Sequence, residues 1–300
     1  MNKKYISAGL VLLSGCTWGC MGLMVRPLNA YGLNSIDISF IRAVITLIAI
    51  TVWLLIFDRE AFKIKLRDIW CFIGTGALSI AFFNYCYFKT IVLTSLSVAA
   101  VLLYTAPAFV MIMSAILFKE RLGKKKLIAL LLAFVGCCLV SGVVGGDAKL
   151  TLPGLLVGIG AGFGYALYSI FSRYAINKGY GSMTITLYTF LTCTITTAYL
   201  ADLGRVTEVM TADLGLLVKT ILLVLLVTLI PYLAYTKGLD GLENGTASVI
   251  ASVEPVMATV LGVVVYHEVP DLWMVIGIVL VLGSIGLVNA KTKSVERNVN

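Results

Sequence analysis

Long apolar runs, joined by short polar or glycine-containing connections, follow one another along the whole chain. Each run has about 20 mainly apolar residues, enough to cross the hydrocarbon core of a bilayer as a helix. Unpaired backbone groups are costly in lipid, which favours helices throughout. The pattern predicts an all-α integral membrane protein with ten transmembrane helices, near residues 5–25, 35–57, 68–88, 95–118, 125–144, 153–173, 184–202, 214–236, 245–266 and 271–290.

The second half of the chain repeats the first at a constant offset of 148 residues. Pro107 and Glu120 of the first half align with Pro255 and Glu268 of the second. Each unit contains five predicted spans, and an odd number makes the two copies enter the membrane from opposite sides. The sequence therefore predicts two inverted five-helix repeats, residues 1–146 and 152–290, followed by a tail at 291–300.

The distribution of cations gives the orientation. With the N-terminus inside, 17 of the 23 Lys and Arg residues fall on the inner side and four on the outer side. This bias predicts that both termini and the tail are cytoplasmic, with the chain in the plasma membrane. Topology accounts for the net charge of +8, so we expect no nucleic-acid partner.

The seven cysteines all fall inside predicted spans, and none forms a C-x-x-C pair. Neither a disulfide framework nor a metal site is expected from them. The chain also lacks a phosphate-binding loop of the form G-x-x-x-x-G-K-[ST]. We therefore predict no cofactor and disfavour a nucleotide-driven pump.

Glu254 is the deepest acid in the predicted spans. A charge near the centre of a span costs about 2.5–3.5 kcal/mol on insertion scales, and such residues usually face a cavity or a partner. The aligned residue of the first repeat is Ala106, so the fold itself does not require the acid. We expect Glu254 to bind substrate or a proton; a structural ion pair, or a contact to a carbonyl freed by Pro255, is the alternative.

Other residues in the spans are weaker candidates for a functional role. Arg42 lies about two turns into its span, where a substrate role and a structural role are equally consistent with the sequence. Glu120 and Glu268 occupy equivalent helix ends on opposite faces and are expected to form gate or helix-end contacts. Pro107 and Pro255 each remove a backbone hydrogen bond, which predicts paired bends around a central cavity.

Aromatic residues recur in the spans and could line that cavity, although each could equally be a packing or interfacial residue. Together they would suit an organic solute with an apolar body and a polar or cationic head. The candidates, with one amide, are Trp18, Asn84, Tyr85, Tyr104, Tyr165, Tyr168, Tyr188, Tyr232 and Tyr235.

Several of these features together resemble the EamA-type members of the drug/metabolite transporter superfamily. They are Trp18-Gly19, Phe40-Ile41-Arg42, the spacing from Pro107 to Glu120-Arg121, and the spacing from Glu254-Pro255 to Glu268. The resemblance implies a ten-helix, inverted-repeat exporter or permease for amino acids, nucleobases or other small metabolites, often driven by protons. The second repeat departs from the first in lacking a counterpart of Arg42 and in carrying His267.

The sequence thus favours a secondary active transporter of small metabolites such as amino acids, working by alternating access with proton coupling through Glu254. Transport of organic cations or quaternary amines is the alternative. In another class, His267 and Asp271 match the H-x-x-x-D pattern of some acyltransferases, but few polar residues surround them in sequence to activate a nucleophile. We expect the protein not to be an enzyme.

Overall fold

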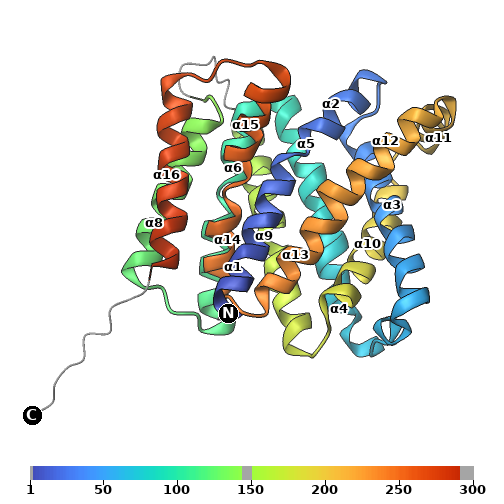
Figure 1. Cartoon of the computed structure of the whole chain (residues 1–300), viewed down its shortest axis with the longest axis horizontal. Coiled ribbons are helices and arrows are strands. Elements are labelled where there is room, and N and C mark those ends of the chain that lie inside the picture. The colour runs from blue at the N-terminus through green and yellow to red at the C-terminus, as the bar shows by residue number, and fades with distance from the viewer. Residues whose placement is uncertain (1–2, 144–150, 291–300) are drawn as a thin grey trace, which may run out of the picture.

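The computed structural model describes residues 3–143 and 151–290, and within these ranges all regular structure is helical (Figure 1). The predicted tail at 291–300 lies outside the described residues. The α-helices are α1 (Lys3–Gly19), α2 (Gly22–Ala30), α3 (Ser35–Phe57), α4 (Ile69–Ile73), α5 (Phe82–Leu93), α6 (Leu96–Leu103), α7 (Ala106–Phe118), α8 (Lys124–Val140), α9 (Leu152–Asn177), α10 (Ser182–Ala198), α11 (Leu203–Ala212), α12 (Leu214–Val224), α13 (Ile230–Leu239), α14 (Asn244–Ala251), α15 (Glu254–Tyr266) and α16 (Leu272–Asn289). Two π-helical segments, η3 (Gly74–Ala81) and η4 (Leu225–Leu229), continue α4 into α5 and α12 into α13, and two short 3-10 turns, η1 (Arg59–Phe62) and η2 (Leu66–Asp68), follow α3.

Each of the ten predicted runs is helical over most of its length, and the chain is confirmed as a helical membrane protein. Eight helical segments of the described chain are long and apolar enough to cross a bilayer, or nine if α10 and α11 count as one bent span. α11 leaves α10 at an angle of 110°, and α8 has 17 residues. The first run extends beyond its predicted end at residue 25, because α2 continues it to Ala30.

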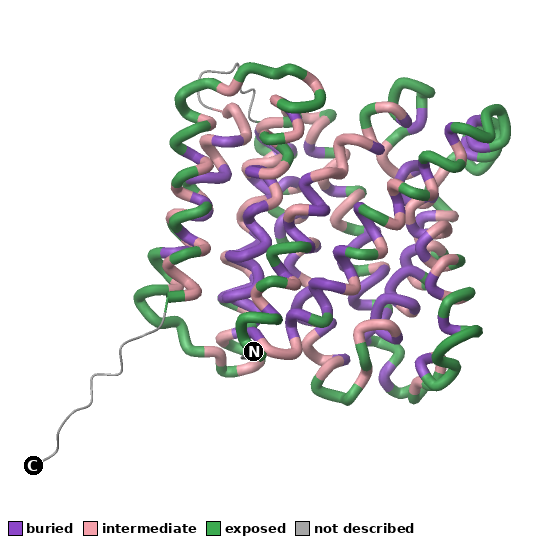
Figure 2. Tube along the Cα trace, viewed as in Figure 1, coloured by how far each residue is buried: buried purple, intermediate pink, exposed green. Residues whose placement is uncertain are grey.

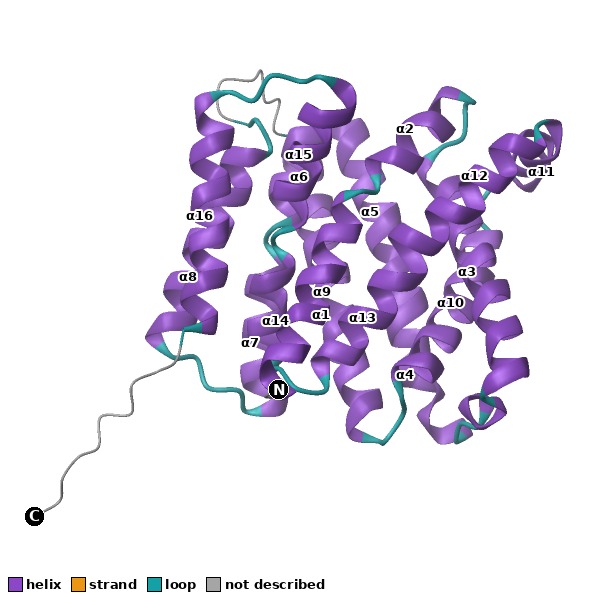
Figure 3. Ribbon diagram, in the orientation of Figure 1, coloured by secondary structure: helices purple, strands orange, loops and turns teal. Residues whose placement is uncertain are grey.

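The offset of 148 residues that aligns the two halves of the sequence also aligns their helix ends. α6 and α7 are separated by two residues, as are α14 and α15, and all four helices begin and end at equivalent positions. Both α7 and α15 end on a left-handed residue, Lys119 at φ 56° and His267 at φ 55°. The two segments run in opposite directions, since α6 and α15 lie toward one end of the bundle and α7 and α14 toward the other (Figure 3).

The outer surface of the bundle is largely apolar and exposed, whereas buried positions gather along the inner helices (Figure 2). Such a surface is suited to lipid. Inside, Ser and Thr hydroxyls bond to carbonyls of their own helices; Thr90 and Thr197, for example, donate to the residues four positions earlier. Many of the interior hydroxyl groups are thereby paired within their own helices.

Two glycines set how closely α8 and α16 pack. A Cβ atom added at Gly277 would lie 2.6 Å from the carbonyl oxygen of Gly136 and 2.9 Å from the backbone nitrogen of Val140. Both obstacles are backbone atoms, which cannot move aside independently. Helices in membranes depend on such close approaches, because lipid offers no hydrophobic drive for their association.

Gly277→Ala should therefore destabilise the protein by about 1–3 kcal/mol, the usual cost of overpacking a tight contact. Gly283→Ala is the matched control on the same helix, because nothing lies within 4 Å of its added Cβ. Thermal unfolding of both variants in one detergent tests this. Equal melting temperatures for the two variants would contradict the proposed packing.

Candidate functional site

An aromatic cluster occupies the middle of the bundle. The Trp18 ring of α1 lies 6.3 Å from the ring of Tyr165, 5.3 Å from that of Tyr232 and 5.4 Å from that of Tyr235, centre to centre. Tyr168 joins through Tyr232, at 5.0 Å, and shares a 2.7 Å hydrogen bond with Thr236. The cluster joins helices α1, α9 and α13, and so connects the two halves of the chain.

Glu254 lies beside this cluster, near the middle of the 23-residue span Asn244–Tyr266. It lines a cavity of about 30 Å³, here called the Glu254 cavity, together with Tyr104, Tyr165 and Tyr235. The Tyr165 hydroxyl donates to Glu254 Oε2 over 3.4 Å. A second cavity of about 20 Å³, the Trp18 cavity, shares Tyr165 and Tyr235 with the first. Each has room for about one water molecule, so a metabolite requires the site to expand.

The prolines stand at the helix breaks that frame the Glu254 cavity. Pro107 follows the break between α6 and α7, and Pro255 follows the break between α14 and α15. Tyr104 and Ser252 lie in the two breaks, and both line the cavity. The breaks of the two halves therefore meet at one site.

Arg42 lies outside the walls of both cavities. Its Nε donates to Thr228 Oγ1 over 3.0 Å, which joins α3 to the π-helical segment η4. Arg42 nevertheless lies close enough to interact electrostatically with Tyr232 and Glu254. In this structure it therefore contributes to the electrostatic field of the site and not to its surface.

Three other predicted site residues lie outside both cavities. Asn84 donates to Ser39 Oγ at 2.9 Å and to the Ile80 carbonyl at 2.8 Å. Tyr188 donates to the Phe62 carbonyl. The side chain of Tyr85 is on the outer surface, with 47% of the residue exposed. Tyr85 therefore faces outward, whereas the polar groups of Asn84 and Tyr188 are used in hydrogen bonds within the protein.

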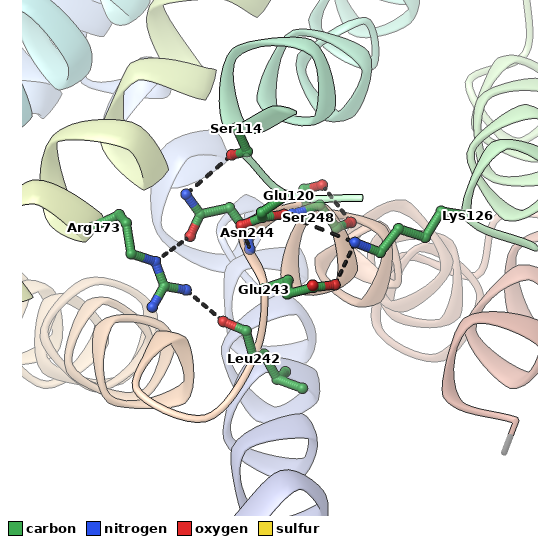
Figure 4. A network of polar contacts seen from close by, with 9 residues as sticks. Ser114, Glu120, Lys126, Arg173, Leu242, Glu243, Asn244 and Ser248 are labelled. Carbon is green, nitrogen blue, oxygen red and sulfur yellow. Dashed lines mark hydrogen bonds and ion pairs between the residues drawn. The ribbon is translucent and has the colours of Figure 1, made fainter. Parts of the chain in front are cut away.

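A polar network closes the end of the bundle that carries the N-terminus (Figure 4). Glu120, directly after α7, accepts hydrogen bonds from the backbone nitrogens of Asn244, at 2.7 Å, and Gly245, at 3.2 Å. These are the first two residues of α14, and the α14 N-cap residue Glu243 makes no capping bond of its own. Glu120 thus contacts the start of the broken helix of the other half.

Further side chains extend this contact into what we call the Glu120 network. The buried Asn244 side chain donates to Ser114 Oγ at 3.1 Å and accepts from Arg173 Nε at 2.9 Å. Arg173 also donates to the Leu242 carbonyl. Lys126 pairs with Glu243 and lies 3.9 Å from Glu120. The network joins α7, α8, α9 and α14.

Glu268, the equivalent of Glu120 in the second half, has different partners at the opposite end. It accepts a 2.9 Å hydrogen bond from Arg26, and both side chains are more than half exposed, at 54% and 53%. The Arg26 guanidinium also lies over the Tyr266 ring, 4.1 Å from its centre. The side chain of Glu120, in contrast, is only 9% exposed. One end of the bundle is therefore closed by a buried contact and the other by an exposed one.

Arg173 and Asn244 are functional candidates that were not identified from the sequence. One signal for Arg173 is its spacing: Tyr165, Ser169 and Arg173 follow one another every four residues and occupy one face of α9. This face leads from the Glu254 cavity to the Glu120 network, since Ser169 bonds to Tyr235 over 2.8 Å. Asn244 gives no comparable signal, because its partners lie far away in sequence.

A bundle of apolar helices around an internal carboxylate, with a contracted cavity between its halves, defines a polytopic membrane protein of the transporter class. The chain belongs to the EamA-like transporter family, whose model matches residues 6–142 and again residues 152–290. The family resemblance seen in the sequence is thereby confirmed.

Similar proteins agree with this assignment. The chain is 28% identical over 235 residues to the uncharacterized transporter YdfC of Bacillus subtilis (strain 168), covering 77% of this chain and 75% of that protein. It is 27% identical to an uncharacterized transporter of Archaeoglobus fulgidus, covering 94% and 95% of the two chains. A solved crystal structure shares the fold, with a TM-score of 0.77 at 16% identity over 94% of this chain and 96% of the other.

This family membership favours transport over the acyltransferase alternative. Asp271 accepts a 2.8 Å hydrogen bond from the Met274 backbone nitrogen and so caps α16. His267 is the left-handed residue that ends α15. Both residues thus have local structural roles at helix ends.

Asn244→Ala should lower the free energy of unfolding by about 1–3 kcal/mol, because Ser114 Oγ and Arg173 Nε lose the partner that the Asn244 side chain provides. Asn289→Ala is the control, since among the described residues the Asn289 side chain bonds to the Ile285 carbonyl of its own helix. Unfolding in detergent with increasing denaturant measures both. A decrease in the free energy of unfolding no larger than in the control would refute the stabilising role of the Glu120 network.

Proposed function

We propose that the protein is a proton-coupled secondary active transporter of a small organic metabolite, an amino acid or an amine, working by alternating access. The observation that carries this proposal is the position of Glu254: mid-span, at a helix break, in a cavity bounded by both halves of the chain. An acid there costs stability, and its position suits binding of a charge that crosses the membrane.

The proposed architecture has ten spans in two inverted repeats, residues 1–146 and 152–290. The common register of the breaks and the opposite directions of α6–α7 and α14–α15 support it. We place both termini on the cytoplasmic side of the plasma membrane, because most cations fall on that side. The Glu120 network then closes the cytoplasmic end.

Coupling would follow from competition for one carboxylate. The change of the site from one side of the membrane to the other is costly while Glu254 is charged and unpaired. Either a proton or a cationic group of the solute neutralises that charge. If the two exclude each other, inward flow of protons drives outward flow of solute. Tyr165, which donates to Glu254, would stabilise the charged form between these two occupied states.

Glu120 and Glu268 would act as alternating gate contacts. In the present state Glu120 supplies acceptors to the unpaired N–H groups at the start of α14, and a carboxylate there also interacts favourably with the helix dipole. By the offset of 148 residues, the equivalent position for Glu268 is the start of α6, at Leu96 and Ser97. We propose that Glu268 exchanges Arg26 for this position when the cytoplasmic end opens.

Glu120→Gln should favour opening at the cytoplasmic end, because a neutral amide binds the α14 N-terminus more weakly than a carboxylate. The measurement is alkylation of Ser248→Cys, a cavity position, by an impermeant thiol reagent in inverted vesicles with the seven native cysteines replaced. A rise of about tenfold in rate is expected, corresponding to about 1.4 kcal/mol.

The control for this experiment is Glu60→Gln, whose carboxylate pairs with Lys63 on an exposed segment. It should leave the alkylation rate unchanged. A rate in Glu120→Gln no higher than in this control would rule out the gate role of Glu120.

Glu254→Gln should abolish solute accumulation driven by a proton gradient in proteoliposomes, because the amide cannot exchange a proton. Glu208→Gln is the control, since Glu208 forms an exposed pair with Arg205 away from the cavity. Proton-driven flux that survives undiminished in Glu254→Gln would overturn the coupling role.

A further inference from the structure

The walls of the Glu254 cavity contain several hydrogen-bond acceptors. A proline has no N–H to donate to the carbonyl four residues before it. Pro107 therefore leaves the Leu103 carbonyl without its usual helical donor. Pro255 does the same for Ala251, whose carbonyl oxygen lies toward Gly15 of α1. Leu103, Ala251 and Glu254 all line this one cavity.

The serine hydroxyls of the cavity add acceptors and few donors. Ser248 donates to the Gly245 carbonyl at 3.0 Å, and Ser252 donates to the Ser248 carbonyl at 3.2 Å. A hydroxyl that has donated its single hydrogen keeps only lone pairs for a ligand. Ser169 and Tyr235 bond to each other within the same wall.

Positive charge is scarce at the same surface. Among the residues that the structure describes, neither the Glu254 cavity nor the Trp18 cavity has a Lys, Arg or His in its wall. Arg42, the nearest candidate from the sequence, donates to Thr228 in place of facing the space. A ligand carboxylate would therefore meet the carboxylate of Glu254 without a cationic side chain in the wall to pair with, and burying an unpaired charge is expensive.

Aromatic faces complete the site. Tyr104, Tyr165 and Tyr235 line the Glu254 cavity, and Trp18 lines the neighbouring one. Aromatic rings attract organic cations through their negative faces and accept apolar bodies of similar shape. This combination favours an organic cation over a metal ion, because only the organic cation also has an apolar body to pack against the rings.

We infer that the Glu254 cavity binds the primary ammonium group of an organic amine, through Glu254 and the hydroxyl oxygens of Ser248 and Ser252, with the apolar body of the amine against the tyrosines. This inference rests on the proposed function and narrows its solute class. A primary ammonium has three N–H donors for these three acceptors. A quaternary ammonium has none, and a zwitterionic amino acid adds a carboxylate that the walls do not match.

The test uses four probes with a common phenyl-ethyl body and different head groups: 2-phenylethylamine, its N,N,N-trimethyl derivative, phenylalanine and 3-phenylpropanoate. Binding to the purified full-length protein is measured by titration calorimetry and by the shift in melting temperature. The primary amine should bind at least about tenfold more tightly than each of the other three, since each lacks a charge-assisted hydrogen bond or adds a repelled charge.

Two variants link the binding to the site. Glu254→Gln should weaken 2-phenylethylamine binding by about tenfold or more, whereas Glu254→Asp, which keeps the charge, should retain part of it. Glu208→Gln should bind like the wild type. The folded state of each variant is checked by its melting temperature without ligand, so that a loss of binding is not mistaken for a loss of fold.

Three results would overturn the inference. One is tighter binding of phenylalanine than of the amine, lost in Arg42→Gln, which would assign a zwitterion site. Another is stabilisation by sodium alone that is lost in Glu254→Gln, which would assign a metal-ion site. The third is the absence of any melting response to 2-phenylethylamine. Glu254-dependent transport of phenylalanine would refute the amine site and leave the carrier standing, whereas absence of countertransport for every bound probe would refute the carrier itself.

Discussion

The structure depends on one constraint: polar backbone groups inside a membrane protein must have hydrogen-bond partners or face a cavity. The two helix breaks before Pro107 and Pro255 are the places where helical pairing of the backbone is interrupted. Pro107 and Pro255 stand in equivalent places in the two halves, each just after a two-residue break. Polar backbone away from helical pairing is tolerated at membrane depth only where it is covered by protein or faces a cavity. The two breaks share one cavity, and that requirement brings the halves together around it.

The chemistry of the two halves differs at the positions where their backbones agree. The residue that begins the second helix after the break is Ala106 in one half and Glu254 in the other. The acid that ends this helix is buried on a helix N-terminus as Glu120 and exposed on Arg26 as Glu268. Two halves with equivalent helix breaks thus carry one internal acid and two unequal closures, which is the arrangement that our proposal of a carrier presenting one site to two sides in turn requires.

Much of the fold could be predicted from the apolar pattern. The span expected at 35–57 is α3 (Ser35–Phe57), and the span expected at 245–266 covers α14 and α15 (Asn244–Tyr266). Hydropathy could not predict the 110° turn between α10 and α11, because apolar residues continue beyond it and the side chain of Asp202 starts the new helix. Nor could it reveal the π-helical segments, one of which packs Gly76 closely against the Thr189 carbonyl of α10.

The site was predictable only in part. Glu254, Trp18 and Tyr165 stood out because their residue types are costly or distinctive in a span, and the structure brings them close together. Tyr85 and Tyr188 are of the same type, but residue type does not tell which face of a helix points inward. The Glu120 network was hidden for another reason: Glu120 and Asn244 lie 124 residues apart and meet only once the halves are assembled.

The central claim is that α7 and α15 are equivalent helices that end on opposite sides of the membrane with Glu254 between them. Single cysteines at Arg121 and Val269, both exposed just beyond these helix ends, test it most directly in a background without native cysteines. An impermeant thiol reagent applied to intact cells should label Val269→Cys at once and Arg121→Cys only after permeabilisation. Labelling of both positions from the same side would contradict the account.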